Sequence, residues 1–296
     1  MPELPEVETI RRQLEPLIVG KTILGVEVLN SGSFRADPNS LIGKTITTVR
    51  RKGKVLIVSL KRPGLARQGR ALYVHLKMSG QLQFKEGLKR SNLAEARLDL
   101  NRYKHLRVKI KFSDKSELWF IDQRKFGWIT DNSAVLPLGI DALDPELTAG
   151  KLTKILKSSH RPVKTILLDQ SKIAGIGNIY ASEILWQAKI NPATKGLTFC
   201  AQSGQSVKFR PAEPGPASQD KLHHAIKRVL TQAIELGGST MDDGLYQHVG
   251  GESGNYWSRR RVYDREGEPC LRCKKPIEKG VIGQRSTYWC SSCQIT

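Results

Sequence analysis

The spacing of apolar residues changes near residue 137, and this change limits the folds that the chain can adopt. From Thr22 to about Ile129 apolar and polar residues alternate, which is the period of strands with one buried face. Beyond residue 150 apolar residues recur every three or four positions, as in amphipathic helices. With 296 residues the chain also exceeds a typical single domain. The pattern therefore predicts an α+β protein of more than one domain.

The first half of the chain is expected to form several short antiparallel strands. Leu106, Val108, Ile110 and Phe112 alternate with basic residues, so one face of their strand is apolar and the other is charged. The predicted strand regions are Thr45–Leu60, Arg70–Phe84, Leu106–Phe112 and Glu117–Phe120. Short strands joined by turns indicate a sandwich or a barrel-like sheet. Pro and Gly residues between 137 and 145 then predict a linker, extending over residues 137–150.

The second half is expected to be helical up to about residue 236. The predicted helices are Glu146–Lys157, Val163–Gln170, Asn178–Ala188 and Lys221–Leu236, the last ended by Gly237-Gly238. Residues 194–219 are rich in Pro, Gly and Ser and lack a period, so we expect a flexible surface insertion there. Cys200, within it, is expected to be a free thiol with no evident use.

The charge of the chain indicates a polyanionic partner. The 48 Lys and Arg residues against 28 Asp and Glu give a net charge of +20, and the hydrophobic content of 39% is sufficient for real cores. For a chain with scattered basic residues nucleic acid is the first candidate, ahead of a membrane surface. No apolar run approaches the roughly 20 residues that span a bilayer, and acids stand where a signal peptide has bases. We therefore expect a cytoplasmic protein.

The first ten residues combine a potential amine nucleophile with a carboxylate. Removal of Met1 would expose the secondary amine of Pro2, followed at once by Glu3. Pro5 suits the first position of a helix that Gly20 can end. Pro16 should kink that helix or end it early. Taken alone, the stretch is better explained as an ordinary N-terminal helix, since most N-terminal prolines indicate no more than that.

Four cysteines near the C-terminus have the spacing of a zinc site. Cys270 and Cys273 form one CxxC pair, Cys290 and Cys293 a second, and residues 274–289 separate them. Two such pairs place four thiolates in the tetrahedron that a structural Zn²⁺ prefers. The segment between them resembles two short strands turning at residues 283–285, which places Arg285 near the tip of a zinc ribbon.

Three further motifs are compatible with contacts to phosphate or bases. The glycine turn at residues 173–178 precedes a helix whose first N–H groups could bind an anion, although most such turns are only turns. Met78 and Phe126 follow strand ends beside basic residues, where they could enter a base stack or simply border a core. The turn at residues 51–54 could hold a phosphate or be merely solvated, and His75 and His105 lack the neighbours of a metal ligand.

These motifs occur together, in this order, in one family. The chain resembles bacterial formamidopyrimidine-DNA glycosylase, an enzyme of base excision repair that removes oxidised purines such as 8-oxoguanine and cleaves the strand as an AP lyase. The resemblance rests on Pro2–Glu8, on the hairpin Gly175–Tyr180 and on Arg265–Cys270. It covers nearly the whole chain apart from residues 194–219. It implies an N-terminal antiparallel β-sandwich flanked by helices, a helix-two-turn-helix domain and a C-terminal zinc ribbon with one structural Zn²⁺.

The resemblance also implies roles for individual residues. Pro2 would attack C1′ of the damaged nucleotide and form a Schiff base, Glu3 would move protons at the sugar, and Lys54 matches the active-site lysine. Glu6 matches a carboxylate lining the lesion pocket, and Arg285 matches a phosphate-holding residue associated with δ-elimination. The remaining matches are Met78, Arg124 and Phe126, which replace the extruded base, Asn178, which holds a phosphate, and Lys164, His75 and His105, which contact DNA.

The chemistry of strand cleavage agrees with an amine nucleophile. Only an iminium at C1′ acidifies the C2′ hydrogen enough for β-elimination. The pKa of an α-amino group is near 8 and that of a lysine side chain is near 10.4. At pH 7 a larger fraction of the terminal amine than of a lysine amine is therefore neutral. Rotating the damaged nucleotide out of the duplex costs a few kcal/mol, which explains inserted side chains and a basic surface.

The chain departs from the family pattern at three places. Lys77 stands where the family often has Gly, which could alter the backbone before Met78, and Lys125 stands where Arg is commoner. Residues 241–256, the expected lesion-covering loop, do not align clearly. We expect domains at residues 1–136, 151–245 and 246–296, joined by the 137–150 linker, in a monomer that acts on double-stranded DNA.

Two alternatives stay open. An endonuclease VIII-type glycosylase would prefer oxidised pyrimidines, although Leu4 and the Met78, Arg124 and Phe126 set favour the purine enzyme. A non-catalytic zinc protein that binds damaged DNA would keep the charge and the cysteines but would not need Pro2 as a free amine.

Overall fold

The structure, a computed structural model, describes residues 1–61, 69–86, 103–197 and 218–295. The chain forms two compact units. The first comprises Met1–Leu136 and Ile234–Trp257, and the second comprises Pro137–Ala233 and Ser258–Thr296. None of the helices in the described ranges is both long and apolar enough to cross a membrane.

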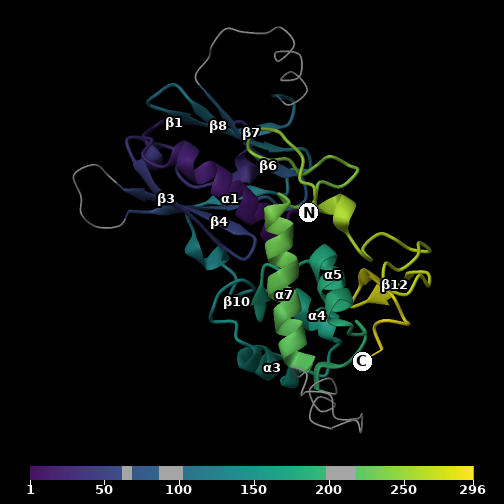
Figure 1. Cartoon of the computed structure of the whole chain (residues 1–296). Helices are drawn as coiled ribbons and strands as arrows, with labels where there is room; N and C mark the ends of the chain where they lie inside the picture. The colour runs from purple at the N-terminus through teal and green to yellow at the C-terminus, as the bar shows by residue number, and fades with distance from the viewer. Residues whose placement is uncertain (62–68, 87–102, 198–217, 296) are drawn as a thin grey trace. The chain divides into compact units, whose positions relative to one another are not determined.

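The first unit begins with helix α1, Leu4–Ile18, shown in purple in Figure 1. Its apolar side chains Val7, Ile10, Leu14 and Ile18 recur at helical spacing and are at most 1% exposed. Pro16 does not end the helix early, because two further helical residues follow it. A proline in the last turn removes one N–H donor, but the residues after it can still be helical and pack against the core.

Two sheets make up the rest of the first unit. One has the strand order β1-β7-β8-β6 and the other β2-β9-β5-β4-β3. The first consists of β1 Ile23–Val28, β7 Leu106–Phe112, β8 Glu117–Asp122 and β6 Gly80–Lys85. The second consists of β2 Phe34–Arg35, β9 Trp128–Thr130, β5 Ala71–His75, β4 Val55–Lys61 and β3 Thr45–Lys52. Among these described strands every pairing is antiparallel except that of β2 with β9.

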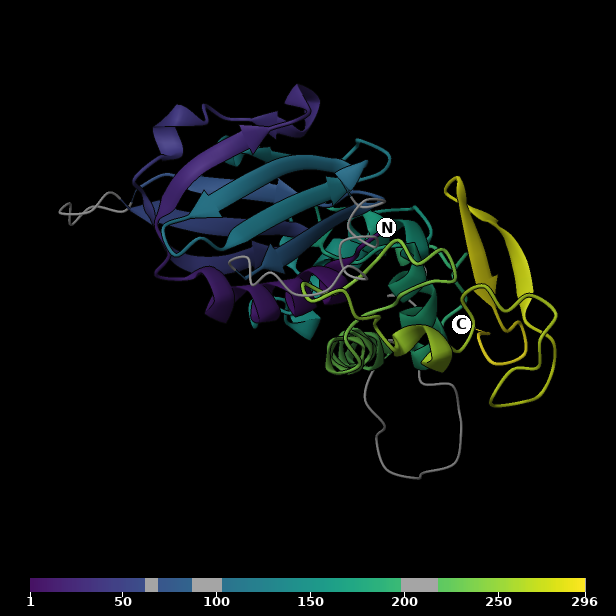
Figure 2. The same ribbon diagram turned by 90° about the horizontal axis from the view of Figure 1, so that it is seen from above.

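One hydrophobic core joins the two sheets and α1. It contains Leu14 of α1, Val58 and Val74 of one sheet, and Ile110 and Phe120 of the other. Figure 2 shows the strands of the two sheets lying one over the other. The predicted β-sandwich is therefore confirmed. Short 3-10 turns at Ser31–Ser33, Asn39–Leu41, Ser133–Val135 and Tyr256–Arg259 complete the regular structure.

The second unit is built mainly from helices. They are α3 Ala149–Lys157, α4 Val163–Leu168, α5 Asn178–Ala188 and α7 Ser218–Glu235, whose last residues enter the first unit. The predicted bounds of α5 agree with these, and those of the other three helices differ by one to three residues at one or both ends. Thr148 caps α3 by accepting a hydrogen bond from Lys151 N at 3.2 Å.

The stretch expected as a linker contains regular structure. Strand β10, Ile140–Asp141, pairs in parallel with β11, Ile173–Ala174. Ala142 and Leu147 are fully buried. A two-residue strand held by a distant partner leaves no periodic signal in the sequence.

The expected insertion at 194–219 lies mostly outside the described residues, as does Cys200. Its first residues are described and are held by backbone hydrogen bonds. Thr194 O accepts from Val163 N at 2.8 Å, and Gly196 N donates to Arg161 O at 3.1 Å. Thr194 and Gly196, at the start of the expected insertion, therefore belong to the folded second unit.

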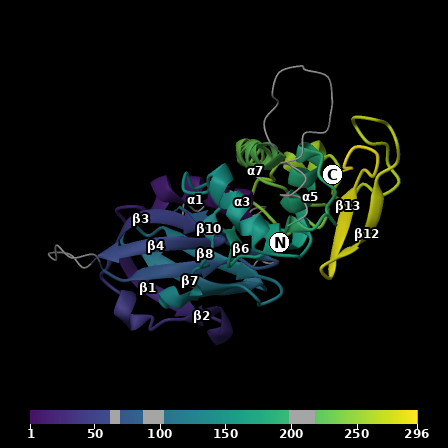
Figure 3. The ribbon, with the colours of Figure 1, turned by 90° about the horizontal axis from the view of Figure 1, so that it is seen from below.

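The second unit ends in a two-stranded hairpin, β12 Glu278–Ile282 and β13 Arg285–Trp289, visible in Figure 3. Its turn is formed by Gly283 and Gln284, with φ of 58° and 61°. Two consecutive left-handed residues match the type I′ turn, which suits the twist of a hairpin. Arg285 is accordingly the first residue of β13 rather than part of the turn.

Candidate active site and nucleic-acid interface

The N-terminal residues are held in place by reciprocal hydrogen bonds at the start of α1. Glu3 is the N-cap, its side chain accepts from the backbone of Glu6, and Glu6 Oε2 accepts from Glu3 N at 2.8 Å. Glu3 and Glu6 are 2% and 1% exposed, and Pro2 is also buried. This is a capping box, with Glu in place of the usual Ser or Thr. It fixes the backbone immediately after Pro2.

The second oxygen of Glu6 binds a segment far along the chain. Oε1 accepts a hydrogen bond from Ser239 N at 2.8 Å. Gly238 has φ of 79°, and a Cβ placed on it would lie 2.9 Å from that same oxygen, so only glycine fits there. One carboxylate thus joins the chain terminus to residues 238–239. Sequence reasoning missed this contact, although the Gly237-Gly238 pair predicts the end of the preceding helix.

Tyr246 supports the same region. Its hydroxyl donates to Gly237 O at 3.0 Å and lies 3.4 Å from Glu6 O. Burial raises the pKa of Tyr246 well above its usual value, and the negative charge of Glu6 raises it further. The phenol therefore stays a donor at neutral pH.

The turn between β3 and β4 carries Lys54, which is 7% exposed. Gly53 has φ of 58°, and its carbonyl accepts from the Arg51 guanidinium at 2.9 Å. Arg51 also donates to Glu8 of α1 at 3.2 Å. The basic turn is therefore tied to the helix that begins beside Pro2.

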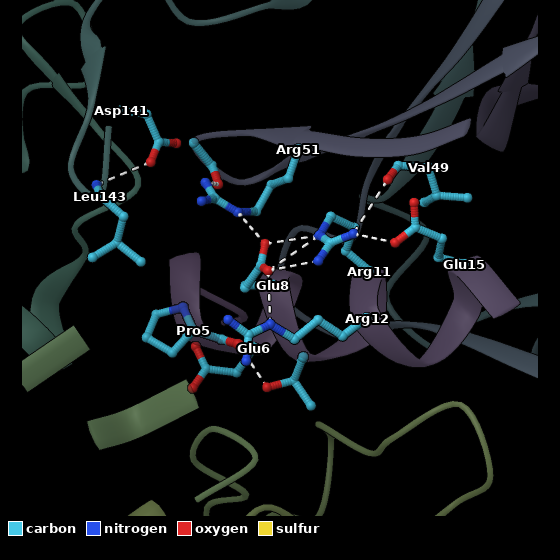
Figure 4. Close-up of polar contacts among 12 residues, drawn as sticks. Pro5, Glu6, Glu8, Arg11, Arg12, Glu15, Val49, Arg51, Asp141 and Leu143 are labelled. Carbon is cyan, nitrogen blue, oxygen red and sulfur yellow. Dashed lines mark hydrogen bonds and ion pairs between the residues drawn. The ribbon is translucent and has the colours of Figure 1, made fainter. Parts of the chain in front are cut away.

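Glu8 is surrounded by three arginines, as Figure 4 shows. Arg11 and Arg12 donate to its carboxylate at 3.0 and 2.9 Å. Burial tends to raise the pKa of Glu8, but these hydrogen bonds and the charges of Arg11 and Arg51 outweigh it, so the pKa lies below its usual value. Glu8 is accordingly ionised at neutral pH and stabilises the position of Arg51.

His75, at the end of β5, is a neutral acceptor. Its Nδ1 accepts from Lys77 N at 2.9 Å. Burial, and then the charges of Lys77 and Lys54, lower the pKa of His75 to about 3. Since Lys77 has φ of 54°, this hydrogen bond supports a lysine in the left-handed conformation.

The three residues expected to enter the base stack lie in two loops of the first unit. Met78 follows β5 and is partly exposed, whereas Arg124 and Phe126 follow β8 and are exposed, Phe126 by 53%. The Arg124 guanidinium lies 5.0 Å from the centre of the Phe126 ring. We call Met78, Arg124 and Phe126 the wedge residues. His105 is half-buried, and its carbonyl accepts from Asp122 N at 2.8 Å.

In the second unit a glutamine holds the glycine hairpin. Gln170 Oε1 accepts from Gly175 N at 2.8 Å, and its Nε2 donates to Leu168 O at 2.9 Å and Ile176 O at 2.8 Å. Gly175 has φ of 109°. Sequence analysis missed Gln170, because the pattern of a turn does not show which side chain satisfies its backbone.

Asn178 and Lys164 meet at strand β13. Asn178 Nδ2 donates to Ser286 O at 3.0 Å, and Lys164 Nζ donates to the same carbonyl at 2.9 Å and to Thr287 Oγ1 at 2.7 Å. Lys164 is fully buried, whereas Arg285 is exposed. In this structure Lys164 and Asn178 therefore support the strand that presents Arg285.

The four cysteine sulfurs fit one zinc ion. All four lie within 4.8 Å of one another, with 3.9 Å between Cys270 and Cys293 and 3.4 Å between Cys273 and Cys290. Zn–S bonds of about 2.3 Å in a tetrahedron require sulfurs about 3.8 Å apart. The four thiols could hold one structural zinc ion.

A buried glutamate that sequence analysis missed connects α5 to the segment before the zinc site. Glu183 is fully buried and accepts from the backbone N–H groups of Arg261, Val262 and Tyr263 at 2.9–3.0 Å. A glutamate in the apolar run of a helix was the only available signal.

Comparison with known proteins gives the family. Three family models match: "Formamidopyrimidine-DNA glycosylase N-terminal domain" over residues 1–129, "Formamidopyrimidine-DNA glycosylase H2TH domain" over 138–208, and "Zinc finger found in FPG and IleRS" over 267–295. The formamidopyrimidine-DNA glycosylase of Chloroflexus aurantiacus is 37% identical, with 100% of this chain and 98% of the relative covered. The chain belongs to the formamidopyrimidine-DNA glycosylase family.

Solved structures of this family agree over the whole chain. The Thermus thermophilus enzyme has 33% identity and a TM-score of 0.77, covering 99% of this chain and 98% of that one. The wild-type Lactococcus lactis enzyme in complex with DNA containing N7-benzyl-Fapy-dG has 31% identity and a TM-score of 0.78, with both chains fully covered. The family, the zinc finger and the fold class expected from the sequence are thereby confirmed.

Proposed function

We propose that this chain is a DNA glycosylase of base excision repair that also cleaves the strand as an AP lyase. The observation that carries the proposal is the likeness over the full length, at 37% identity, to formamidopyrimidine-DNA glycosylases. The Lactococcus lactis relative was solved in complex with DNA containing an abasic site, and a mutant of it with DNA containing Fapy-dG. The net charge of +20 suits the same partner.

The N-terminal geometry supports Pro2 as the nucleophile after removal of Met1. The nitrogen of Pro2 would form a bond to C1′ while the bond from C1′ to the damaged base breaks and the base leaves with a proton. Opening of the sugar gives an iminium, and loss of a C2′ proton then breaks the C3′–O bond. Glu3, which is next to Pro2 and whose N–H donates to Glu6, would move protons at the sugar.

Further residues take supporting roles in this proposal. Lys54 assists near the base and phosphate, and Glu6 lines the lesion pocket while it fixes the terminus. The wedge residues fill the space of the extruded nucleotide, with Arg124 facing the orphaned cytosine. His75 is half-buried and neutral, so contact of its ring with phosphate would be through an N–H donor rather than a charge.

In the second unit Arg285 would bind phosphate and take part in δ-elimination. Asn178 would share the phosphate contacts, and Lys164 would act mainly through strand β13, to which it donates at Ser286 and Thr287. Zinc would stabilise the hairpin that carries Arg285 without entering the reaction, since four-thiolate sites are closed. We also propose a functional division into residues 1–136, 151–245 and 246–296, which differs from the two compact units because residues 234–257 belong to the first of them. The enzyme would be a cytoplasmic monomer that acts at the nucleoid.

The experiment compares two damaged duplexes. We expect excision and strand cleavage at 8-oxoguanine opposite cytosine to exceed that at thymine glycol opposite adenine. A strong preference for thymine glycol would instead assign the chain to the endonuclease VIII type of lesion specificity. That alternative has a specific basis, because a Lactococcus lactis relative was solved with DNA containing an oxidised pyrimidine. Binding to both duplexes without cleavage of either would refute the catalytic proposal.

A further inference from the structure

The two loops that carry the wedge residues share one buried carboxylate, that of Asp122. Asp122 ends β8, is fully buried, and pairs in register with Gly80 at the start of β6. These two strands are neighbours in the four-stranded sheet. The carboxylate therefore lies where the Met78 loop and the loop of residues 123–127 leave neighbouring strands.

Each loop donates hydrogen bonds to this carboxylate. Ser79 Oγ donates to Oδ1 at 2.5 Å, and Gly127 N donates to Oδ2 at 2.7 Å. Arg124 N lies 3.2 Å from Oδ1 and 3.0 Å from Ser79 Oγ, so it is shared between the two loops. Ser79 is itself 3% exposed. Hydrogen bonds to a charged acceptor are the stronger kind.

The two loops are bound in the same way on either side of Met78 and Phe126. Met78 lies between Lys77, with φ of 54°, and Ser79, which binds Asp122. Phe126 lies between Lys125, with φ of 58°, and Gly127, which also binds Asp122. In both loops a lysine in the left-handed conformation, which is unfavourable for residues other than glycine, directly precedes the wedge side chain.

Gly127 leaves no room for a side chain beside the carboxylate. A Cβ on it would lie 2.7 Å from the Phe120 ring, 3.1 Å from Asp122 Oδ2 and 3.1 Å from His75 O. The main-chain side of Asp122 is fixed as well, since its carbonyl accepts from Arg107 Nε at 2.8 Å. Both the backbone and the carboxylate of Asp122 are therefore fixed by hydrogen bonds, and the carboxylate connects the Met78 loop to the loop of residues 123–127.

We propose that Asp122 is a positioning residue that presets Met78, Arg124 and Phe126 as one rigid wedge before DNA is bound. This inference rests on the proposed glycosylase function. If the two loops were disordered before binding, ordering them would add an entropic cost to the free energy of extruding the nucleotide. Loops that are already ordered can insert their side chains into the base stack without that cost. Asp122 itself does not contact the reacting atoms in this proposal.

The test replaces Asp122 by Asn. An amide offers one oxygen in place of two, so either the Ser79 and Arg124 donors or the Gly127 N–H would face an NH2 group. We expect excision of 8-oxoguanine from duplex DNA to fall at least about tenfold, the equivalent of one charge-assisted hydrogen bond. Cleavage of a single-stranded abasic oligonucleotide, which has no stack to enter, should change less than about twofold. The exposed Asp37, which accepts a hydrogen bond from Asn39 N, gives the matched control Asp37→Asn.

A second variant and readout keep the test decisive. Ser79→Ala removes one donor from the Met78 loop alone, and should show the same split between duplex and single strand to a smaller degree. If Asp122→Asn loses the wild-type circular dichroism spectrum, Ser79→Ala carries the test. A 2-aminopurine beside the lesion should report slower unstacking in either variant.

Two outcomes distinguish a failure of the positioning role of Asp122 from a failure of the proposed glycosylase function. If Asp122→Asn and Ser79→Ala both match wild type on the duplex, or lose duplex and single-strand activity equally, the positioning role is wrong. If wild type itself cleaves neither substrate, the proposed function is wrong instead.

Discussion

The most informative single substitution is Glu6→Gln, because it changes one atom of a buried group that holds two distant backbone sites. Glu6 Oε2 accepts from Glu3 N and Oε1 from Ser239 N, each at 2.8 Å, and the side chain is 1% exposed. A glutamine has one acceptor oxygen, so one of these N–H groups must face an amide NH2 group.

The expected cost follows from these two hydrogen bonds. Loss of one charge-assisted hydrogen bond from a buried site costs about 1.5–3 kcal/mol, and the remaining bond, now to a neutral acceptor, weakens by about 1 kcal/mol. The total is about 2.5–4 kcal/mol for the local free energy of opening. That corresponds to a loss of roughly 60- to 700-fold in hydrogen-exchange protection.

Hydrogen exchange followed by mass spectrometry on peptides containing Glu3 and Ser239 is the assay. Glu15→Gln on the same helix is the matched control, since Glu15 is 45% exposed and its ion pair with Arg11 should contribute less than about 1 kcal/mol. If Glu6→Gln exchanges like wild type and like this control in both peptides, the capping-box account of the N-terminus is refuted.

Four further predictions concern other residues. Lys77→Gly should raise the free energy of unfolding, measured by urea denaturation, by about 0.5 kcal/mol. Glycine adopts a φ of 54° without steric cost, and this gain exceeds the larger chain entropy that glycine loses on folding. A variant less stable than wild type would contradict this. Glu183→Gln should lower the same quantity by about 2 kcal/mol, because its three backbone hydrogen bonds lose their charged acceptor; an unchanged thermal midpoint would count against it. The pKa of His75 is about 3 in the folded protein and higher in the unfolded chain, so the unfolded chain binds more protons between these values. Stability should therefore decrease as pH falls from about 6.5 towards 3, and His75→Gln should reduce that slope; a slope equal to wild type would refute it. Removal of zinc by a chelator should unfold the β12–β13 hairpin and abolish binding to duplex DNA, whereas unchanged affinity after verified zinc loss would contradict the structural role.

Much of the architecture could be predicted because it depends on local patterns. The alternation of β7 and the helical spacing of α5 predicted the observed bounds of both elements. The cysteine spacing predicted a cluster whose sulfurs lie within 4.8 Å. In each case the residues that carry the signal are near one another in the chain.

The polar contacts that position the site could not be predicted in this way. Ser239 meets Glu6 and Lys164 meets Ser286 across more than a hundred residues of chain, and no periodicity encodes such a meeting. Lys164 illustrates the difference, since the family resemblance implies a DNA contact for it, whereas the fold buries it and pairs its Nζ with Ser286 O of β13. In the sequence Asp122 is only the start of a basic loop, because its role depends on which strands are neighbours.

The central claim is that the nitrogen of Pro2 is the nucleophile, and borohydride trapping with peptide mapping tests it most directly. The enzyme is incubated with a duplex containing 8-oxoguanine, the imine is reduced, and the cross-linked protein is digested and sequenced by mass spectrometry. We predict one adduct, on a terminal peptide that begins with Pro2 and has lost Met1. An adduct on a lysine such as Lys54, or strand cleavage with Met1 retained, would contradict the account.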